Sequence, residues 1–328
     1  MKTLLLLLLV LPIIGFGQNV NIPDANFKAY LVGNTDINTN GDNQIQVSEA
    51  SAFNDTINCS YLDISNLKGI EAFSALTSLW CMGNQLTSLD VSKNTVLTWL
   101  ICDDNQLTSL NVSKNTALTS LSCGGNQITS LDVSKNTALT DLDCRQSNLT
   151  SLDVSKNTAL TSLDCEGLGL TSLDVSKNTA LRGLVCSFNG LTSLDVSKNT
   201  ALRGLDCSFN KLTSLNVSKN TALSGLVCFD NQLTSLDVSK NIALTDLNCG
   251  DNLTSLDVSK NTALTSLSCG DNQLKSLDLS KNTALTYLSC YGNQLTSLDV
   301  SKNTALTDLD CGGNKFDCEA LKRKYGLD

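Results

Sequence analysis

Cysteine recurs at a nearly constant interval of 21 residues along this 328-residue chain, and this period limits the fold more than any other feature. One interval is 22 residues and one is 20, the latter because a residue is missing between Asn252 and Leu253. The repeated cysteines are Cys59, Cys81, Cys102, Cys123, Cys144, Cys165, Cys186, Cys207, Cys228, Cys249, Cys269, Cys290 and Cys311. Such a period is the signature of a solenoid, in which each repeat buries its apolar side only by stacking on its neighbours.

The residues around each cysteine follow one frame, which runs from Leu97 to Leu107 in a representative copy. It reads L-x-x-L-x-C-x-x-N-x-L, which is the leucine-rich-repeat frame with cysteine in place of the third leucine. Leu100 and Cys102 are two residues apart, so both are expected to point inward from a short strand while Trp99 points outward.

The rest of each repeat supplies the turns that close a coil. Asn105 follows the strand, and its side chain can bond backbone groups of neighbouring coils, which predicts an asparagine ladder interrupted at Ser147 and Leu168. The second half, L-T-S-L-D-V-S-K-N-T-A, hardly varies and is too short and too β-branched for a helix, which favours extended or 3₁₀ turns. Thirteen rungs with little bending predict a rod about 58 Å long.

The two ends of the chain differ from the repeats. Residues 1–17 combine a positive start, an apolar run and small residues before a cut, which predicts a cleavable signal peptide and a secreted or cell-surface protein. We predict a β-rich leucine-rich-repeat solenoid with a parallel β-sheet on its concave face and few helices. Its parts are the signal peptide at 1–17, an N-terminal cap with an EF-hand-like loop at 18–58, the repeat array at 59–315 and a C-terminal cap at 316–328.

The cysteine slot, the 21-residue period and the near-constant second half together resemble a known group of proteins. They are similar to the cysteine-ladder branch of the internalin-type repeats, the internalin J-like bacterial leucine-rich-repeat proteins. The resemblance covers roughly Cys59 to Cys311. It implies a secreted or surface-exposed array that serves adhesion and protein binding, and no enzyme.

Composition excludes several classes of function. The chain has no histidine, so it lacks an imidazole base, the usual catalytic triads and a His-ligated zinc site. Its net charge of −9 argues against nucleic-acid binding, which needs clustered Lys and Arg. No segment after the signal peptide is apolar enough for membrane insertion, and we expect a monomer.

The cysteines themselves are interpreted as core residues, because a small thiol suits the thin interior of a coil. Disulfides between rungs are disfavoured, since stacked rungs hold their Cβ atoms about 4.8 Å apart, beyond the usual mean near 3.8 Å. Metal binding lacks any C-x₂₋₄-C pair. We therefore expect mostly free ladder thiols. Cys318 lies outside the ladder, and a Cys311–Cys318 bridge that closes the C-terminal cap is open but not favoured.

The N-terminal cap contains a segment that resembles a twelve-residue EF-hand loop and predicts a weak Ca²⁺ site. Its candidate ligands are Asn38, Asn40, Asp42, Gln44 and Glu49, at loop positions 1, 3, 5, 7 and 12. Only two of them are charged, which predicts an affinity near the millimolar range. Asn43 takes the place of the turn glycine, and asparagine tolerates a positive φ. A metal-free, solvated turn that caps the solenoid is the alternative.

Variation among the repeats concentrates on the outward positions around the strands, which predicts a recognition surface there for a protein or glycan. The candidate ligand-binding residues are Trp80, Trp99, Ile101, Asp143, Asp164, Phe188, Phe209, Phe229, Tyr287 and Tyr291. The two tryptophans are expected to serve in binding or in packing against the cap. A spine in the turns is the alternative for the three phenylalanines, and a solvated face is the alternative for the aspartates.

The leading hypothesis is thus a secreted or cell-surface binding and adhesion protein. An enzyme would need Asp143 and Asp164 as a carboxylate pair, and a flat strand face offers no enclosure that would raise a carboxyl pKa. A structural or ice-binding solenoid is the other alternative, and it would use regular threonines. These threonines are Thr87, Thr108, Thr129 and Thr150. They do not form paired rows and every coil carries lysine, which argues against ice binding.

Overall fold

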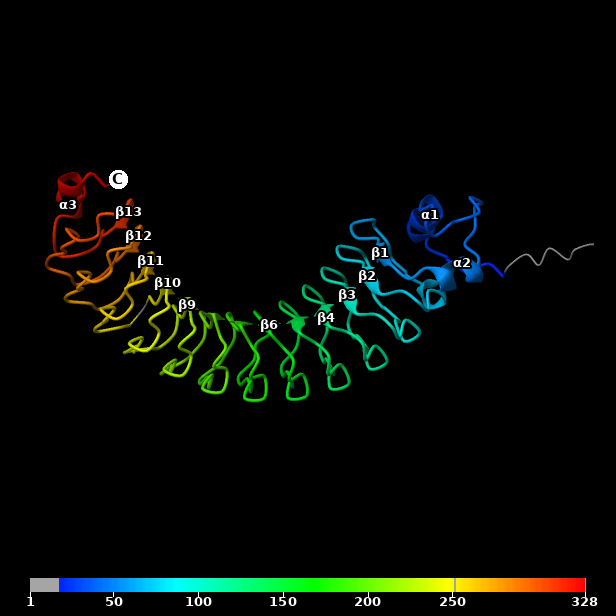
Figure 1. The fold of residues 1–328 in the computed structure, drawn as a ribbon, viewed down its shortest axis with the longest axis horizontal. Helices are drawn as coiled ribbons and strands as arrows, with labels where there is room; N and C mark the ends of the chain where they lie inside the picture. The colour runs from blue at the N-terminus through cyan, green and yellow to red at the C-terminus, as the bar shows by residue number, and fades with distance from the viewer. Residues whose placement is uncertain (1–17, 251, 328) are drawn as a thin grey trace, which may run out of the picture.

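The computed structural model describes residues 18–250 and 252–327 as one solenoid bent into an arc (Figure 1). Within this part of the chain, thirteen strands form one parallel sheet on the concave side, in the order of the sequence. The strands are β1 (Thr56–Asn58), β2 (Ser78–Trp80), β3 (Trp99–Ile101), β4 (Ser120–Ser122), β5 (Asp141–Asp143), β6 (Ser162–Asp164), β7 (Gly183–Val185), β8 (Gly204–Asp206), β9 (Gly225–Val227), β10 (Asp246–Asn248), β11 (Ser266–Ser268), β12 (Tyr287–Ser289) and β13 (Asp308–Asp310). The predicted leucine-rich-repeat solenoid is confirmed.

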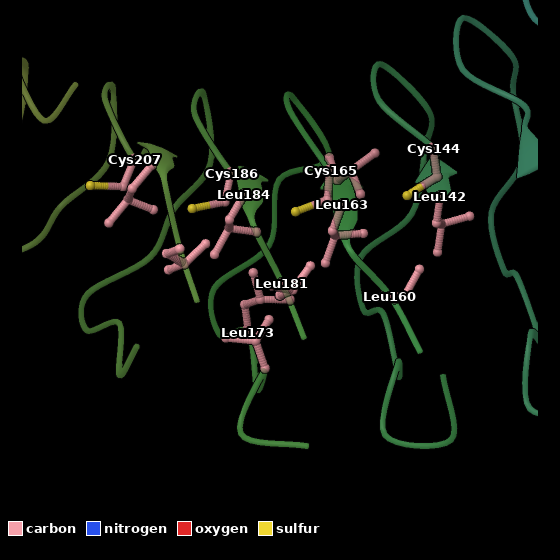
Figure 2. Close-up of a cluster of buried hydrophobic side chains, with 14 of the residues drawn as sticks. Leu142, Cys144, Leu160, Leu163, Cys165, Leu173, Leu181, Leu184, Cys186 and Cys207 are labelled. Atoms are coloured by element: carbon pink, nitrogen blue, oxygen red, sulfur yellow. The ribbon is translucent and has the colours of Figure 1, made fainter. Parts of the chain in front are cut away.

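Strand β1 contributes the inward Ile57 and each later strand one inward leucine, and the ladder cysteine follows directly after the strand. Leu100 in β3 and Cys102 are fully buried, whereas Trp99 is 45% exposed. The parallel register places equivalent residues of neighbouring coils beside each other. Figure 2 shows the result in the middle of the array, where leucines and cysteines recur in the same places through consecutive coils, from Cys144 to Cys207. The predicted inward and outward directions are therefore confirmed.

The ladder cysteines are small core residues. All of them are buried, and from Cys59 to Cys290 none forms a disulfide within the described residues. Burial raises the pKa of Cys59 and Cys290 to about 12, so the thiolate that would oxidise or bind a metal is scarce. Several thiols also lie near a carbonyl of the next coil, as Cys81 Sγ does at 3.5 Å from the oxygen of Ile101. A leucine at this position would offer no such donor.

The last rung differs, because Cys311 forms a disulfide with Cys318. The sequence analysis did not favour this bridge and was wrong on that point. The argument from parallel Cβ atoms holds for two stacked rungs, whereas Cys318 begins helix α3 (Cys318–Tyr325) and is not a rung. The two Cα atoms are 5.5 Å apart, within the range that a disulfide spans. The bridge ties the C-terminal helix to the end of the array.

The convex side consists of turns that a ladder of buried asparagines holds together. This ladder is separate from the one predicted directly after the strands. Asn136 is fully buried, and its Nδ2 donates to the carbonyls of Val112 at 3.0 Å and Asn115 at 2.9 Å. Corresponding bonds recur along the array from Asn94 to Asn303. Each of these asparagines also joins two consecutive i, i+3 turns of the backbone. The expected 3₁₀-like turns are therefore present, and each buried amide links its coil to the preceding coil.

The arc departs from the straight rod that the sequence analysis predicted, so the expectation of little bending was wrong (Figure 1). On the concave side, direct backbone hydrogen bonds hold neighbouring strands about 4.8 Å apart. On the convex side, asparagine side chains lie between the backbones that they join. A side chain inserted between two backbones needs more room than a direct bond, so the convex side is longer and the array curves.

Short helices cover both ends of the array (Figure 1). At the N-terminal end, α1 (Ala25–Gly33) buries Phe27 and Leu31 against the first coils, and α2 (Val47–Ala52) and the 3₁₀ helix η1 (Ile70–Ala72) complete the cap. Strand β1 already belongs to the sheet although it precedes Cys59, so the cap passes into the array without a break.

Asp317 is the N-cap of the C-terminal helix α3, and its carboxylate accepts a hydrogen bond from the Ala320 N–H. No helix in the described part of the chain is long and apolar enough to span a membrane. The predicted signal peptide at residues 1–17 lies outside the described residues.

Candidate binding surface on the strand face

An aromatic pocket opens at the N-terminal end of the concave face, where the cap meets the first rungs. Its cavity has a volume of about 430 Å³. It is lined by Tyr30, Asn58, Ser60, Tyr61, Leu62, Trp80, Met82 and Ile101. The predicted residues Trp80 and Ile101 therefore meet in one site, and the Trp99 ring lies beside it, 5.9 Å from the Trp80 ring. A concave, mostly apolar cavity with a few polar groups is typical of a binding site.

Tyr61 is the main residue of this pocket that the sequence analysis missed. Its side chain is 69% exposed and lies over Gly83 of the next coil, where any Cβ would collide with the ring. Its hydroxyl donates to Met82 Sδ at 2.6 Å. Tyr30 reaches the pocket from α1 in the cap. One signal pointed to Tyr61, because it stands two residues after the ladder cysteine, where most coils carry glycine or aspartate.

Asp143 and Asp164 lie side by side on β5 and β6, and Arg145 bridges them. The Arg145 Nε is 3.4 Å from Asp143, and its Nη1 is 3.6 Å from Asp164. Burial raises the pKa of Asp143 to about 6 and also raises the pKa of Asp164. The expectation that a flat strand face cannot raise a carboxyl pKa was therefore wrong, because neighbouring rungs cover these groups. The guanidinium engages both carboxylates, which makes them an ion-pair network and not a free acid–base pair.

The three predicted phenylalanines form one aromatic cluster at the edge of the strand face. Phe188 and Phe209 stack with ring centroids 4.0 Å apart, and Phe209 meets Phe229 edge-on at 4.9 Å. Phe188 is 53% exposed, and the preceding coil carries Gly167 at the same position. The Phe188 ring thus lies on the outside of its coil and is not buried in the turn.

Phe188 and Phe209 hold these positions at a cost in backbone energy. Both have a left-handed backbone, with φ of 53° and 52°. That conformation costs a bulky residue about 1–2 kcal/mol, and glycine or aspartate stands at the same position in most other coils. Phe229 comes one residue earlier in its repeat, so Asp230 takes the left-handed position there. The stacking of the two rings, worth about 0.5–1.5 kcal/mol, offsets part of this strain.

The remaining predicted residues, Tyr287 and Tyr291, belong to one coil but lie in different places. Both are exposed, Tyr287 by 42% and Tyr291 by 48%. Tyr291 lines a second cavity of about 430 Å³ that Phe229 also borders, and Tyr287 lies outside that lining. The structure therefore distributes the predicted ligand-binding residues over several sites along the arc and does not gather them into one patch.

The EF-hand-like loop is closed by hydrogen bonds among its own residues. Glu49 accepts from the backbone N–H groups of Thr39, Asn40 and Gln46 at 2.9 to 3.2 Å. The last of these bonds also caps α2. The carboxylate at loop position 12 thus already joins the two ends of the loop, and a bound Ca²⁺ would have to share its oxygens.

The left-handed residue of this loop lies two positions before Asn43. Gly41, with φ of 71°, is left-handed, and Asn43 is not. Glycine adopts this conformation without strain, so Asn43 needs no special backbone geometry. The Asn40 side chain accepts from the Asp42 N–H at 2.8 Å, and the Asp42 side chain accepts from the Gln44 N–H at 2.6 Å. These two successive Asx turns fix the path of the loop.

Asn38 is the predicted ligand that best fits a cation. Its Nδ2 donates to the carbonyls of Val32 and Asp42, while its buried Oδ1 has no hydrogen-bond partner. The Gln44 side chain instead accepts from the Lys28 ammonium at 3.2 Å, which places a positive charge beside the loop. In the part of the chain that the structure describes, no three His, Cys, Asp or Glu side chains form a group able to hold a metal ion. The two charged residues among the predicted ligands, Asp42 and Glu49, already accept hydrogen bonds within the loop.

Comparisons with known proteins agree with this architecture. A family model described as leucine-rich repeats (2 copies) matches residues 262–303. The sequence matches none of the curated proteins. Among solved structures, the functional domain of InlJ from Listeria monocytogenes, which includes a cysteine ladder, is 38% identical with a TM-score of 0.69. That match covers 89% of this chain and 75% of the InlJ chain.

Two further solved structures share the fold at lower identity. The internalin InlF from Listeria monocytogenes is 21% identical with a TM-score of 0.74, over 91% of this chain and 98% of that chain. A leucine-rich-repeat protein of Leptospira interrogans is 24% identical with a TM-score of 0.76, over 85% and 78%. The identity to InlJ over most of the chain, together with the 21-residue period and the buried cysteine column, shows that this chain belongs to the leucine-rich-repeat proteins of the internalin J-like, cysteine-ladder type.

Proposed function

We propose that this protein is an exported binding and adhesion protein that recognises a protein or glycan through its concave strand face. The observation that carries the proposal is the pocket formed by Tyr61, Trp80 and Met82, with Trp99 exposed beside it. Tryptophan and tyrosine anchor many protein interfaces because they offer large apolar surfaces with few rotatable bonds. Leucine-rich-repeat domains of the internalin type are typically binding domains, and this likeness supports a location outside the cell or at its surface.

A comparison of two exposed apolar residues tests this proposal. Partners captured from host or community surface extracts on the purified chain are identified and then titrated in purified form. Trp99→Ala should weaken their binding by at least roughly tenfold, because truncation of an anchoring ring costs about 2 kcal/mol or more. Ile242→Ala is the matched control, since Ile242 is 63% exposed but follows the buried Asn241 in the convex half. Equal weakening by both variants, or by neither, would contradict recognition by the strand face.

We also propose that the N-terminal loop binds Ca²⁺ weakly and stabilises the cap. The supporting observation is the buried Oδ1 of Asn38, which has no partner in the loop. With a Kd of about 1 mM, 10 mM Ca²⁺ would add about 1.4 kcal/mol to the free energy of unfolding. The expected result is a melting temperature that rises with calcium and falls again when a chelator is added.

The variant Asn38→Asp sharpens the calcium test. Aspartate is the usual residue at position 1 of such a loop, and it adds a negative charge to the ligand set. In chelator the variant should melt below the wild type, because the Nδ2 bonds to Val32 and Asp42 are lost. Calcium should raise the melting temperature of the variant by more than it raises that of the wild type. A melting temperature that ignores calcium in both proteins would leave the loop as a metal-free cap.

A further inference from the structure

The second cavity of the concave face lies near the C-terminal end of the arc, between two aromatic residues. Phe229 and Tyr291 occupy the same position of the repeat, directly after the ladder cysteine, and the two coils between them carry Gly250 and Gly270 there. Three coil spacings separate the two aromatic residues, which places their backbones roughly 14 Å apart. The gap of about 430 Å³ therefore has an aromatic residue at each end and a floor of bare backbone.

The two glycines keep this floor open. A Cβ at Gly250 would lie 3.0 Å from the carbonyl oxygen of Gly270, and a Cβ at Gly270 would lie 3.3 Å from the carbonyl oxygen of Tyr291. Other coils place large side chains at this position, among them Arg145 and Glu166. The cavity thus exists because two successive coils lack a side chain where an aromatic residue stands on either side.

Polar side chains border the cavity on the strand side. The neutral row consists of Asn248, Ser268 and Ser289, the last residues of β10, β11 and β12. In the described residues, the polar side-chain atoms of this row make no hydrogen bond to the protein. Asp310 continues the row on β13, and its carboxylate accepts one bond, from the Gly312 N–H at 3.4 Å. An amide, two hydroxyls and a carboxylate are therefore available to a ligand.

The charges of the residues that line the cavity restrict which kinds of ligand can bind there. Asp230, Asp271 and Asp310 border the cavity, and among the described residues of its lining there is no Lys or Arg, so an anionic ligand is repelled. A cation would pair with the carboxylates and could donate to the hydroxyl oxygens, but it has no acceptor for the amide N–H groups of Asn248. A sugar satisfies both groups, because its hydroxyls donate to carboxylates and accept from amides, while its C–H surface packs against aromatic rings.

We propose that this cavity binds one sugar unit of a neutral glycan, and that the glycan continues along the same edge over Phe209 and Phe188. The inference rests on the proposed function only in using the strand face as the binding face. It also gives the left-handed Phe188 and Phe209 a role, since their rings extend the aromatic surface that begins at Phe229. The glycan site is distinct from the pocket at Trp80, which lies at the other end of the arc.

Calorimetric titration of the purified full chain tests the proposal. The probes are cellohexaose, maltohexaose, xylohexaose, mannohexaose and laminarihexaose as neutral glycans, hexagalacturonate as the anionic control and hexalysine as the cationic control. At least one neutral probe should bind, and hexagalacturonate should not. Tyr291→Ala and Asn248→Ala should each weaken that binding by roughly tenfold or more, equivalent to about 1.4 kcal/mol. Tyr287→Ala is the matched control, since this tyrosine is exposed in the same coil but lies outside the cavity.

Three results would overturn the glycan site. These are the absence of binding by every neutral probe, stronger binding of hexalysine than of any sugar, and equal effects of Tyr291→Ala and Tyr287→Ala. Trp99→Ala separates this proposal from the proposed function. If it weakens the captured partner while no neutral probe binds, the glycan site is wrong and strand-face recognition stands. If a sugar binds and depends on Tyr291 while Trp99 has no effect on any partner, the glycan site stands without the N-terminal pocket.

Discussion

The two halves of each coil differ in what their side chains do for the fold. In the convex half, Asn178 is fully buried and its amide donates to the carbonyls of Val154 and Asn157, in an arrangement that recurs along the array. In the strand half, Phe188 holds a left-handed backbone and Asp143 is a half-buried carboxylate beside another acid. Both halves join the coils, the strand half through its backbone ladder and the convex half through buried asparagines, but the strand half also carries features that cost stability. Natural sequences keep such features where they serve function.

Among the three test substitutions, removal of a buried asparagine of the convex half should have the largest effect on stability, apart from the control variants. Asn178→Ala removes two buried hydrogen bonds between coils, while the Val154 and Asn157 carbonyls keep their backbone donors. Each lost bond costs about 0.5–1.5 kcal/mol, so the free energy of unfolding should fall by about 1–3 kcal/mol. Denaturant unfolding followed by circular dichroism measures it. Asn111→Ala is the control, because Asn111 is exposed and accepts a single bond from the Ser113 N–H. A similar loss in both variants would mean that the buried ladder does not join the coils.

Replacing a covered carboxylate of the strand half should have a smaller effect that depends on pH. Burial raises the pKa of Asp143 from 3.8 to about 6, so the folded state binds the proton more tightly than the unfolded state. The contribution of this group to the free energy of unfolding is therefore fully present below pH 4 and is lost as the pH rises through 6. Asp143→Asn should therefore be more stable than the wild type at pH 8, by about 1 kcal/mol after solvent screening, with no difference at pH 3.5.

Asp132→Asn is the matched control in the convex half. Hydrogen bonds from Ser134 lower the pKa of Asp132, so its contribution is present at neutral pH and is lost as the pH falls below its usual range. This variant should be less stable than the wild type at pH 8, which is the opposite sign. Thermal melts of the three proteins across pH 3.5 to 8 compare the two directly. If both substitutions changed stability in the same direction at pH 8, the two halves of the coil would not differ in how they affect their carboxylates.

Removing a strained phenylalanine should have the smallest effect on stability. Phe188→Gly loses a stacked ring, worth about 0.5–1.5 kcal/mol, but relieves a left-handed backbone that costs about 1–2 kcal/mol. The free energy of unfolding should change by less than about 1 kcal/mol, whereas Leu184→Ala in the same coil should cost about 2–5 kcal/mol. A loss above about 2 kcal/mol for Phe188→Gly would favour the spine interpretation of the phenylalanines.

The solenoid was readable from the sequence because a local frame repeated thirteen times fixes which residues face inward. Cys102 and Leu100 could be assigned to the core from their spacing alone, and the structure buries both. The curvature was not readable in this way, because it depends on how far neighbouring coils stand apart on each side. The Cys311–Cys318 bridge was missed for a related reason, since the direction of α3 relative to the last rung is a tertiary property.

The candidate sites likewise contain residues that the sequence predicts and residues that only the tertiary structure brings in. The sequence placed Trp80, Trp99 and Ile101 on neighbouring rungs, and the structure adds Tyr61 and Tyr30 to their pocket. Tyr30 lies in the cap and no periodicity connects it to the repeats. The second cavity depends on two glycines that carry no side chain. No reactive or aromatic residue therefore marks the floor of this cavity in the sequence.

The sequence by itself determined the architecture, the buried cysteine column and the face on which variation occurs, because period and alternation set the direction of each side chain. Only the tertiary structure decided which outward residues meet. Phe229 and Tyr291 are separated by 62 positions in the chain, yet they border one cavity because three coil spacings of about 4.8 Å bring them together. Burial of Asp143 likewise follows from the rungs on either side of it, and a single repeat does not contain that information.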